Sequence, residues 1–268
     1  KIFQKSSQKF TKIVNQYIWM KVVATIQARY SSKRFPGKVL EKIGKKSILQ
    51  ILLERLKKSK YINKIYVSTS RNKSNIKLIN FLKKKKINFY AGSENNVLDR
   101  VSQTLKIAKA DVHIECFGDS PFLDIEVLDK NINFFFKKKF DVVTNTLKTT
   151  FPPGNEFLIY KAEILHEVNK ILKKKDKLRE HVGYNILRFK KKYRIKNIRA
   201  PKKYFFPNIH LEIDEPLDLF FLKKVYQGVS KKKNYFSLND IILFLKKNKH
   251  LEKINFNVHR RWKKFRNE

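Results

Sequence analysis

The sequence predicts an α/β protein whose central sheet is mostly parallel, Rossmann-like, and carries helices on both faces. In the first half of the chain, short apolar runs alternate with stretches whose apolar residues recur at helical spacing. Strand–helix–strand units of this kind make right-handed crossovers, which place successive strands parallel in one sheet. Hydrophobic residues form 42% of the 268-residue chain, which is enough for a sizeable buried core.

The elements follow one another in a regular order in the first half and a less regular one in the second. Continuous or alternating apolar runs predict strands at 22–26, 65–68, 88–90, 112–116, 141–144, 157–160, 193–198 and 209–213. Apolar stripes at helical spacing predict helices at 48–56, 76–82, 97–105, 127–136, 162–172, 179–189, 216–225 and 238–245. The basic tail at 259–266 is expected to be exposed.

The first nineteen residues do not read as part of this fold. They are basic and contain serines, as in targeting peptides, but they lack an apolar core and a cleavage signal. Met20 is followed at once by the first predicted strand. We therefore interpret 1–19 as an extension and 20–268 as a single domain, because the sequence has no internal repeat and no Gly/Ser linker.

The net charge of +39 suggests a nucleic-acid or anionic-membrane partner. However, lysine outnumbers arginine about fourfold, and Ile, Asn, Phe and Tyr are abundant while Gly and Pro number 7 each. This is the composition expected of an AT-rich genome, and most lysine runs fall at the predicted ends of helices, where they complement the helix dipole. We therefore interpret the charge as solvated surface and regard a nucleic-acid partner as unlikely.

Cysteine use and hydropathy limit the compartment and the type of site. Cys116 is the single cysteine, so no intrachain disulfide can form, and no Cys/His cluster suggests zinc. No run of 18 apolar residues is present, so we expect no membrane span. These features favour a reducing, cytoplasmic compartment.

The loop after the first strand is the strongest candidate for binding phosphate. It carries four cationic side chains, two hydroxyls and a Pro-Gly turn; the cationic residues are Arg29, Lys33, Arg34 and Lys38. Arginine forks and a lysine can neutralise a polyphosphate. The loop matches neither the Walker A nor the dinucleotide pattern. Charge alone leaves a solvated basic turn equally open.

Two aspartates follow predicted strands in this acid-poor chain. Asp119 comes after 112–116 beside Gly118, and Asp214 comes after 209–213 and before a Pro-started helix. Ligands bind at the carboxyl ends of strands in open α/β sheets, and Mg²⁺ takes one or two carboxylates plus substrate phosphates. Each aspartate alone is equally compatible with helix capping. Together with the cationic loop they predict a metal–polyphosphate site.

Five segments together resemble the CMP-sugar synthetases, including the 3-deoxy-manno-octulosonate and acylneuraminate cytidylyltransferases. The pattern is most similar to the branch of spore coat polysaccharide biosynthesis protein F. The first segment, Ala28-Arg29-x-Ser-Ser-x-Arg34-x-Pro36-Gly37-Lys38, is quite specific. The others are individually weak but match in order and approximate spacing; they cover 92–100, 118–121, 179–182 and 213–219.

This resemblance implies a nucleotidyltransferase that moves CMP from CTP to an acidic, nonulosonate-like sugar and releases pyrophosphate, often as a homodimer, in surface polysaccharide or glycan biosynthesis. It implies Mg²⁺ on Asp119 and Asp214, with Arg29 and Lys38 as catalytic residues on the triphosphate. The implied nucleotide-binding residues are Ala28, Arg29, Arg34, Lys38, Ser93, Asp99 and Arg100. The implied substrate-binding residues are Glu156, Arg179, Glu180 and His181.

One segment departs from the family pattern. Where many members of the branch carry Gly-Leu-Asp-x-Glu, this chain has Gly154-Asn155-Glu156-Phe157-Leu158. The segment is expected to shape the acceptor pocket, so the identity of the sugar stays open. Two alternatives also remain: a glycosyltransferase that uses a nucleotide-sugar, and a basic nucleic-acid-binding protein.

Overall fold

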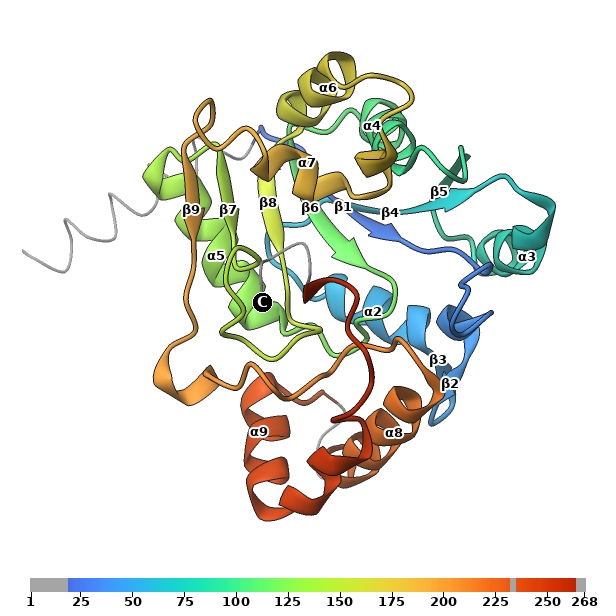
Figure 1. Ribbon diagram of the computed structural model, residues 1–268, viewed down its shortest axis with the longest axis vertical. Helices are drawn as coiled ribbons and strands as arrows, with labels where there is room; N and C mark the ends of the chain where they lie inside the picture. Colours follow the sequence, from blue (N-terminus) through green and yellow to red (C-terminus); the bar gives the residue numbers. More distant parts are fainter. Residues whose placement is uncertain (1–18, 232–234, 264–268) are drawn as a thin grey trace, which may run out of the picture.

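A seven-stranded sheet lies at the centre of the computed structural model, which describes residues 19–231 and 235–263 (Figure 1). Its strands run in the order β5-β4-β1-β6-β8-β7-β9. They are β1 (Val22–Gln27), β4 (Lys64–Ser70), β5 (Phe89–Gly92), β6 (Val112–Phe117), β7 (Val142–Thr144), β8 (Leu158–Lys161) and β9 (Ile195–Asn197). β8 is antiparallel to both neighbours and the other pairs are parallel, which confirms a mostly parallel α/β sheet.

Helices cover both faces of the sheet, as predicted (Figure 1). One face packs against α2 (Ile48–Leu56), α3 (Ile76–Lys84) and α5 (Ile125–Lys138). The other face packs against α4 (Val97–Ala108), α6 (Ala162–Ile171) and α7 (Val182–Leu187). The helices α8 (Pro216–Ser230) and α9 (Leu238–Lys247) build a further layer with its own apolar cluster.

Short elements complete the described chain. A two-stranded ribbon joins β2 (Lys42–Ile43) to β3 (Lys46–Ser47). The 3₁₀ helices are η1 (Lys38–Leu40), η2 (Lys73–Asn75), η3 (Lys177–Glu180), η4 (Lys202–Tyr204) and η5 (Lys249–Ile254).

Local sequence explains why the helices begin where they do. α2 starts at a capping box, in which the Ser47 hydroxyl accepts from the amide of Gln50 and the Gln50 side chain accepts from the amide of Ser47. Asn96 caps α4 and Asp124 caps α5 through their side-chain oxygens. These caps fix the loops that lead from the carboxyl edge of the sheet into the helices.

Residues 209–213 were predicted to form a strand, and this prediction is wrong. The segment is an extended loop that is buried, with Ile209, Leu211 and Ile213 in the cluster beneath α8 and α9. Its amides bond to other loops: that of Leu211 donates to the carbonyl of Pro153 at 2.7 Å, and that of Ile213 to the carbonyl of Asp119 at 2.9 Å. Asp214 therefore follows a buried loop, not a strand end.

The predicted helix at 179–189 is shorter and interrupted. Residues Lys177–Glu180 form η3, His181 is extended with φ −110° and ψ 90°, and α7 begins at Val182. The break coincides with two side-chain contacts: Arg179 reaches toward α4, and the amide of Gly183 donates to Glu115.

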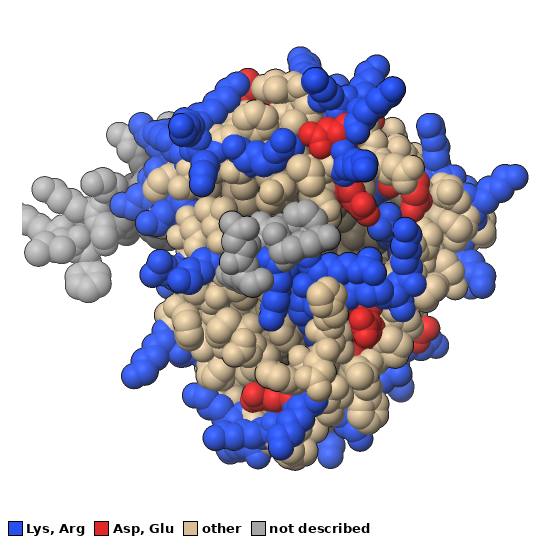
Figure 2. All heavy atoms as spheres, in the orientation of Figure 1, with Lys and Arg blue, Asp and Glu red and all other residues tan. Residues whose placement is uncertain are grey.

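The expected extension at 1–19 lies outside the described residues except for Trp19, whose surface is 88% exposed. No helix within 19–231 and 235–263 has both the length and the apolar character needed to cross a membrane. Figure 2 shows lysine and arginine side chains spread over the visible face, with one band crossing its centre.

Candidate active site

The loop after β1 and the turn after β6 meet at the carboxyl edge of the sheet. β1 and β6 are parallel neighbours in which Gln27 pairs with Phe117, so both chains leave the sheet at the same level. At Gly118 a Cβ atom would lie 2.9 Å from the carbonyl oxygen of Gln27 and 3.0 Å from the Cβ of Ala28. Only glycine lets the two segments approach this closely.

Lys38 joins the two aspartates that the sequence singled out. Its Nζ lies 2.6 Å from Oδ2 of Asp119 and 3.7 Å from Oδ1 of Asp214, and it also donates to the carbonyl of Ile213. Burial works against the charge of Lys38, but Asp119 and Asp214 more than offset it and raise the pKa of its ammonium group. Lys38 is therefore a buried group at the sheet edge that is charged at neutral pH.

Asp214 is surrounded by cations from two parts of the chain, the loop after β1 and the C-terminal segment. The guanidinium of Arg34 lies 2.5 Å from its Oδ1, and that of Arg260 lies 3.7 Å from its Oδ2. The structure thus brings Arg34, Lys38, Asp119 and Asp214 together as one cluster. The triphosphate of a nucleotide could exchange with the carboxylates as partner of these cations.

The two carboxylates suit a hard divalent cation that also binds substrate phosphates. They converge on one position, because a single ammonium group contacts both. Within 19–231 and 235–263, no group of three or more His, Cys, Asp or Glu residues could hold a metal by itself. Mg²⁺ typically uses one or two carboxylates plus phosphates, so two oxygen donors fit it. Asp119 and Asp214 are the residues that would hold it.

Arg29, at the start of the loop after β1, bridges two acidic residues. Its guanidinium is 3.4 Å from Glu94 and 2.9 Å from Glu180, and the hydroxyl of Ser31 donates to Glu94 at 2.9 Å. Burial opposes ionisation of Glu94, but hydrogen bonds from Ser70 and Ser31 and the nearby arginines lower its pKa overall. Glu94 was not singled out from the sequence, yet it links the loop between β5 and α4 to residues 28–38, the predicted phosphate loop.

Three predicted nucleotide-binding residues form hydrogen bonds within the protein itself. Arg100 is buried and donates to the carbonyl of Ser93 at 2.7 Å; burial lowers its pKa to about 10, Arg29 adds to this, and Glu94 and Glu180 oppose it. The Ser93 hydroxyl accepts from the amide of Asn96. Asp99 accepts from Gln103 and Asn169. These bonds shape the loop before α4, and direct contact with a nucleotide stays a prediction.

Arg179 belongs to the same structural group. It is buried, and its guanidinium donates to the side chain of Asn96 at 2.9 Å and to the carbonyl of Leu172 at 2.8 Å. Since Asn96 caps α4, Arg179 ties η3 to the loop that Arg100 holds from within. Contact of Arg179 with a sugar stays a prediction.

The other predicted acceptor residues lie on two separate loops. Glu180 faces the phosphate loop through Arg29, and His181 follows it at the start of α7. Glu156 accepts from the amide of Gly154 at 2.6 Å. Gly154 has φ 97°, and a Cβ there would lie 2.5 Å from the carbonyl carbon of Leu211, so the Glu156 loop packs directly on the segment leading to Asp214.

A buried carboxylate below the site was not predicted. Glu115 in β6 accepts from Gln27 at 2.8 Å, from Tyr160 at 3.0 Å and from the amide of Gly183 at 3.2 Å. Burial raises its pKa to about 7, although these three bonds oppose the shift. The sequence contained a signal for this site: Glu115 is an acidic residue inside a mostly apolar strand, and such a residue needs hydrogen-bond partners when it is buried.

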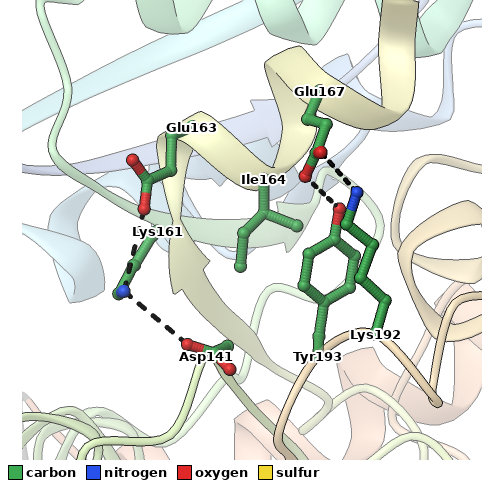
Figure 3. Close-up of a pocket in the computed structure, with 7 residues that line it drawn as sticks. All are labelled: Asp141, Lys161, Glu163, Ile164, Glu167, Lys192 and Tyr193. Atoms are coloured by element: carbon green, nitrogen blue, oxygen red, sulfur yellow. Dashed lines mark hydrogen bonds and ion pairs between the residues drawn. The ribbon is translucent and has the colours of Figure 1, made fainter. Parts of the chain in front are cut away.

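A cavity of about 390 Å³ lies at the opposite edge of the sheet (Figure 3). Asp141 precedes β7 and Lys161 ends the antiparallel β8, so both lie at the amino ends of the parallel strands. The charged side chains around it form ion pairs with one another: Lys161 pairs with Asp141 and Glu163, and Glu167 pairs with Lys192. Tyr193 donates a hydrogen bond to Glu167. None of the predicted site residues lines it.

Comparison with known proteins identifies the family. The family profile described as "Cytidylyltransferase" matches residues 23–254. The spore coat polysaccharide biosynthesis protein SpsF of Bacillus subtilis is 30% identical over 231 residues, which cover 85% of this chain and 95% of that protein. An 8-amino-3,8-dideoxy-manno-octulosonate cytidylyltransferase of Shewanella sp. is 30% identical over 130 residues, 47% of this chain and 52% of its own.

A solved structure gives the same result for the fold. A cytidylyltransferase from Leptospira borgpetersenii superposes with a TM-score of 0.79 at 27% identity, covering 90% of this chain and 100% of that chain. The matched profile covers most of the chain, including the phosphate loop and both aspartates. The chain therefore belongs to the cytidylyltransferase family of nucleotidyltransferases.

Proposed function

We propose that this protein transfers CMP from CTP to an acidic, nonulosonate-like sugar in surface polysaccharide or glycan biosynthesis, with Mg²⁺ as cofactor. The observation that carries the proposal is the convergence of Lys38, Asp119 and Asp214 at the carboxyl edge of the sheet. A buried ammonium between two carboxylates can serve a polyphosphate and a divalent cation at the same place.

In the proposed reaction the anomeric hydroxyl oxygen of the sugar bonds to the α-phosphorus of CTP. The bond from that phosphorus to the bridging oxygen breaks, pyrophosphate leaves, and the hydroxyl proton passes to solvent. Lys38 and Arg29 neutralise charge that grows on the leaving phosphates, and Arg34 holds Asp214. A bound Mg²⁺ would supply Lewis-acid polarisation of the phosphate oxygens.

The acceptor class rests on two supports. The resemblance in sequence points to acidic sugars, and two matched relatives are named for polysaccharide biosynthesis and for an octulosonate. Glu156 stands where many proteins of the branch have Asp, and its loop packs on the Asp214 segment. The longer side chain is expected to select the sugar among related acids.

Release of pyrophosphate tests the proposal. The purified protein is incubated with CTP, Mg²⁺ and a panel of 3-deoxy-octulosonates and nonulosonates, with ATP, GTP and UTP as controls. We expect pyrophosphate only with CTP, only with Mg²⁺, and only with certain sugars. Release of free nucleotide from a nucleotide-sugar, without pyrophosphate, would instead support the glycosyltransferase alternative.

A further inference from the structure

The C-terminal segment, residues 255–263, returns from the α8–α9 layer to the candidate site (Figure 1, dark red). The carbonyl of His259 accepts a hydrogen bond of 2.9 Å from Arg34 in the phosphate loop. The indole of Trp262 donates to Glu212 at 2.7 Å. Of the tail that was expected to be exposed, residues 259–263 are described: His259, Arg261 and Lys263 are exposed, but Arg260 is buried and Trp262 is half-buried. The segment therefore packs against the site and forms a wall of it.

Arg260 is the most buried cation of this wall. Its side chain is 1% exposed, and it forms two parallel bonds to Asp218, at 2.6 Å to Oδ1 and 3.0 Å to Oδ2. Arg261, the next residue, is exposed. Burial opposes both charges, but their mutual bonds outweigh it: the pKa of Asp218 is lowered and that of Arg260 is raised.

Asp218 in turn binds the backbone of Asp214. Its Oδ2 accepts from the amide of Asp214 at 2.8 Å and from the amide of Glu215 at 2.9 Å. Asn255 donates to the other oxygen of Asp218 at 2.8 Å. The backbone of Asp214 is thus fixed by Asp218, which is in turn fixed by Arg260.

A buried ion pair is weak evidence for stability, because desolvation consumes much of its Coulombic gain. Positioning explains the arrangement better. Arg260 acts on Asp214 twice: through Asp218 on its backbone, and directly on Oδ2 at 3.7 Å, while Arg34 holds Oδ1. Groups that orient a metal-binding carboxylate in this way tune affinity and activity.

We propose that Arg260 is a positioning residue that sets the orientation and affinity of Asp214 for a divalent cation, so that the C-terminal segment is part of the active site. This inference rests on the proposed function, because it assigns Asp214 to the metal. It adds a contribution from a segment beyond the residues matched by the family profile.

The test measures metal binding without turnover. Mn²⁺ binding is followed by the loss of the free-ion electron paramagnetic resonance signal, in the presence of a CTP analogue that cannot be cleaved. We expect Arg260→Ala to weaken Mn²⁺ affinity by roughly 10–100-fold, and Arg261→Ala to leave it unchanged. Guanidinium ion, added far below unfolding concentrations, should partly restore binding in Arg260→Ala alone.

Arg260→Lys keeps the test decisive if Arg260→Ala does not fold. Lysine retains the charge but cannot make two parallel bonds, so affinity should fall by an intermediate factor, whereas Arg261→Lys should match the wild type. Wild-type affinity in folded Arg260→Lys and Arg260→Ala would overturn the positioning role. Absence of Mn²⁺–nucleotide binding by the wild type would overturn the proposed function instead.

Discussion

The ammonium group of Lys38 lies 2.6 Å from Oδ2 of Asp119, although the residues are 81 positions apart in the sequence. The pair brings together the loop after β1 and the turn after β6, the two segments that end at the same sheet edge. Under the proposed function, a nucleotide that enters with a metal would replace this internal pairing: a phosphate would contact Lys38 and the metal would bind Asp119.

Asp119→Asn should therefore abolish most of the CMP transfer while the protein stays folded. Loss of one electrostatic contact in a site of this kind commonly costs about 10²–10³ in rate. Asn keeps the size of the side chain, and Asp119 is partly exposed, so melting should change little. Pyrophosphate release and thermal denaturation check both expectations, with Glu163→Gln at the opposite edge as the matched control. Full activity of Asp119→Asn would contradict the site assignment.

Gly118→Ala should separate the two segments that the glycine lets approach. The added methyl would lie 2.9 Å from the carbonyl oxygen of Gln27 and 3.0 Å from the Cβ of Ala28, so the backbone must move. Such overpacking typically costs about 1–3 kcal/mol of stability. We expect a lower melting temperature and a higher KM for CTP. An unchanged KM would show that the phosphate loop tolerates the displacement.

The sequence predicted the sheet and its edge well because both depend on local periodicity. The limits expected for α2, 48–56, are those observed, and the aspartate after β6 lies where parallel strands must end. The segment 209–213 was misassigned because alternating apolar residues bury equally well in a strand and in a packed loop. The sequence could not distinguish the buried Arg260 from the exposed Arg261, because the partner of Arg260, Asp218, is 42 positions away.

Glu115 should make stability depend on pH. Its pKa, about 7 in the folded protein, is higher than that of an unfolded glutamate, so folding binds a proton between these values. The stability that this proton contributes is present in full at low pH and is lost as the pH rises through about 7. Glu115→Gln removes this dependence. From pH 5 to pH 8, the unfolding free energy of the wild type should therefore fall relative to that of Glu115→Gln, by at most about 1.4 kcal/mol per pH unit.

Denaturant unfolding of both proteins at several pH values measures this difference directly. The pKa of Glu212 is also raised to about 7, chiefly by burial and then by Asp214. Its contribution to the pH dependence of stability has the same sign and is present in both proteins. The difference between the curves therefore isolates Glu115. Parallel curves would mean that Glu115 is ionised in the fold throughout this range.

Glu180→Gln should tighten CTP binding if Arg29 serves the triphosphate. Glu180 now neutralises Arg29 at 2.9 Å, and a nucleotide must compete with it. Glu180 is about half exposed, so the pair is screened and is worth about 0.2–1 kcal/mol, which corresponds to at most a several-fold lower KM for CTP. Glu163→Gln, whose carboxylate pairs with Lys161 at the far edge, removes the same charge without touching Arg29. A fall in KM in both variants would reflect net charge alone, whereas a fall confined to Glu180→Gln would identify Arg29 as the competing group.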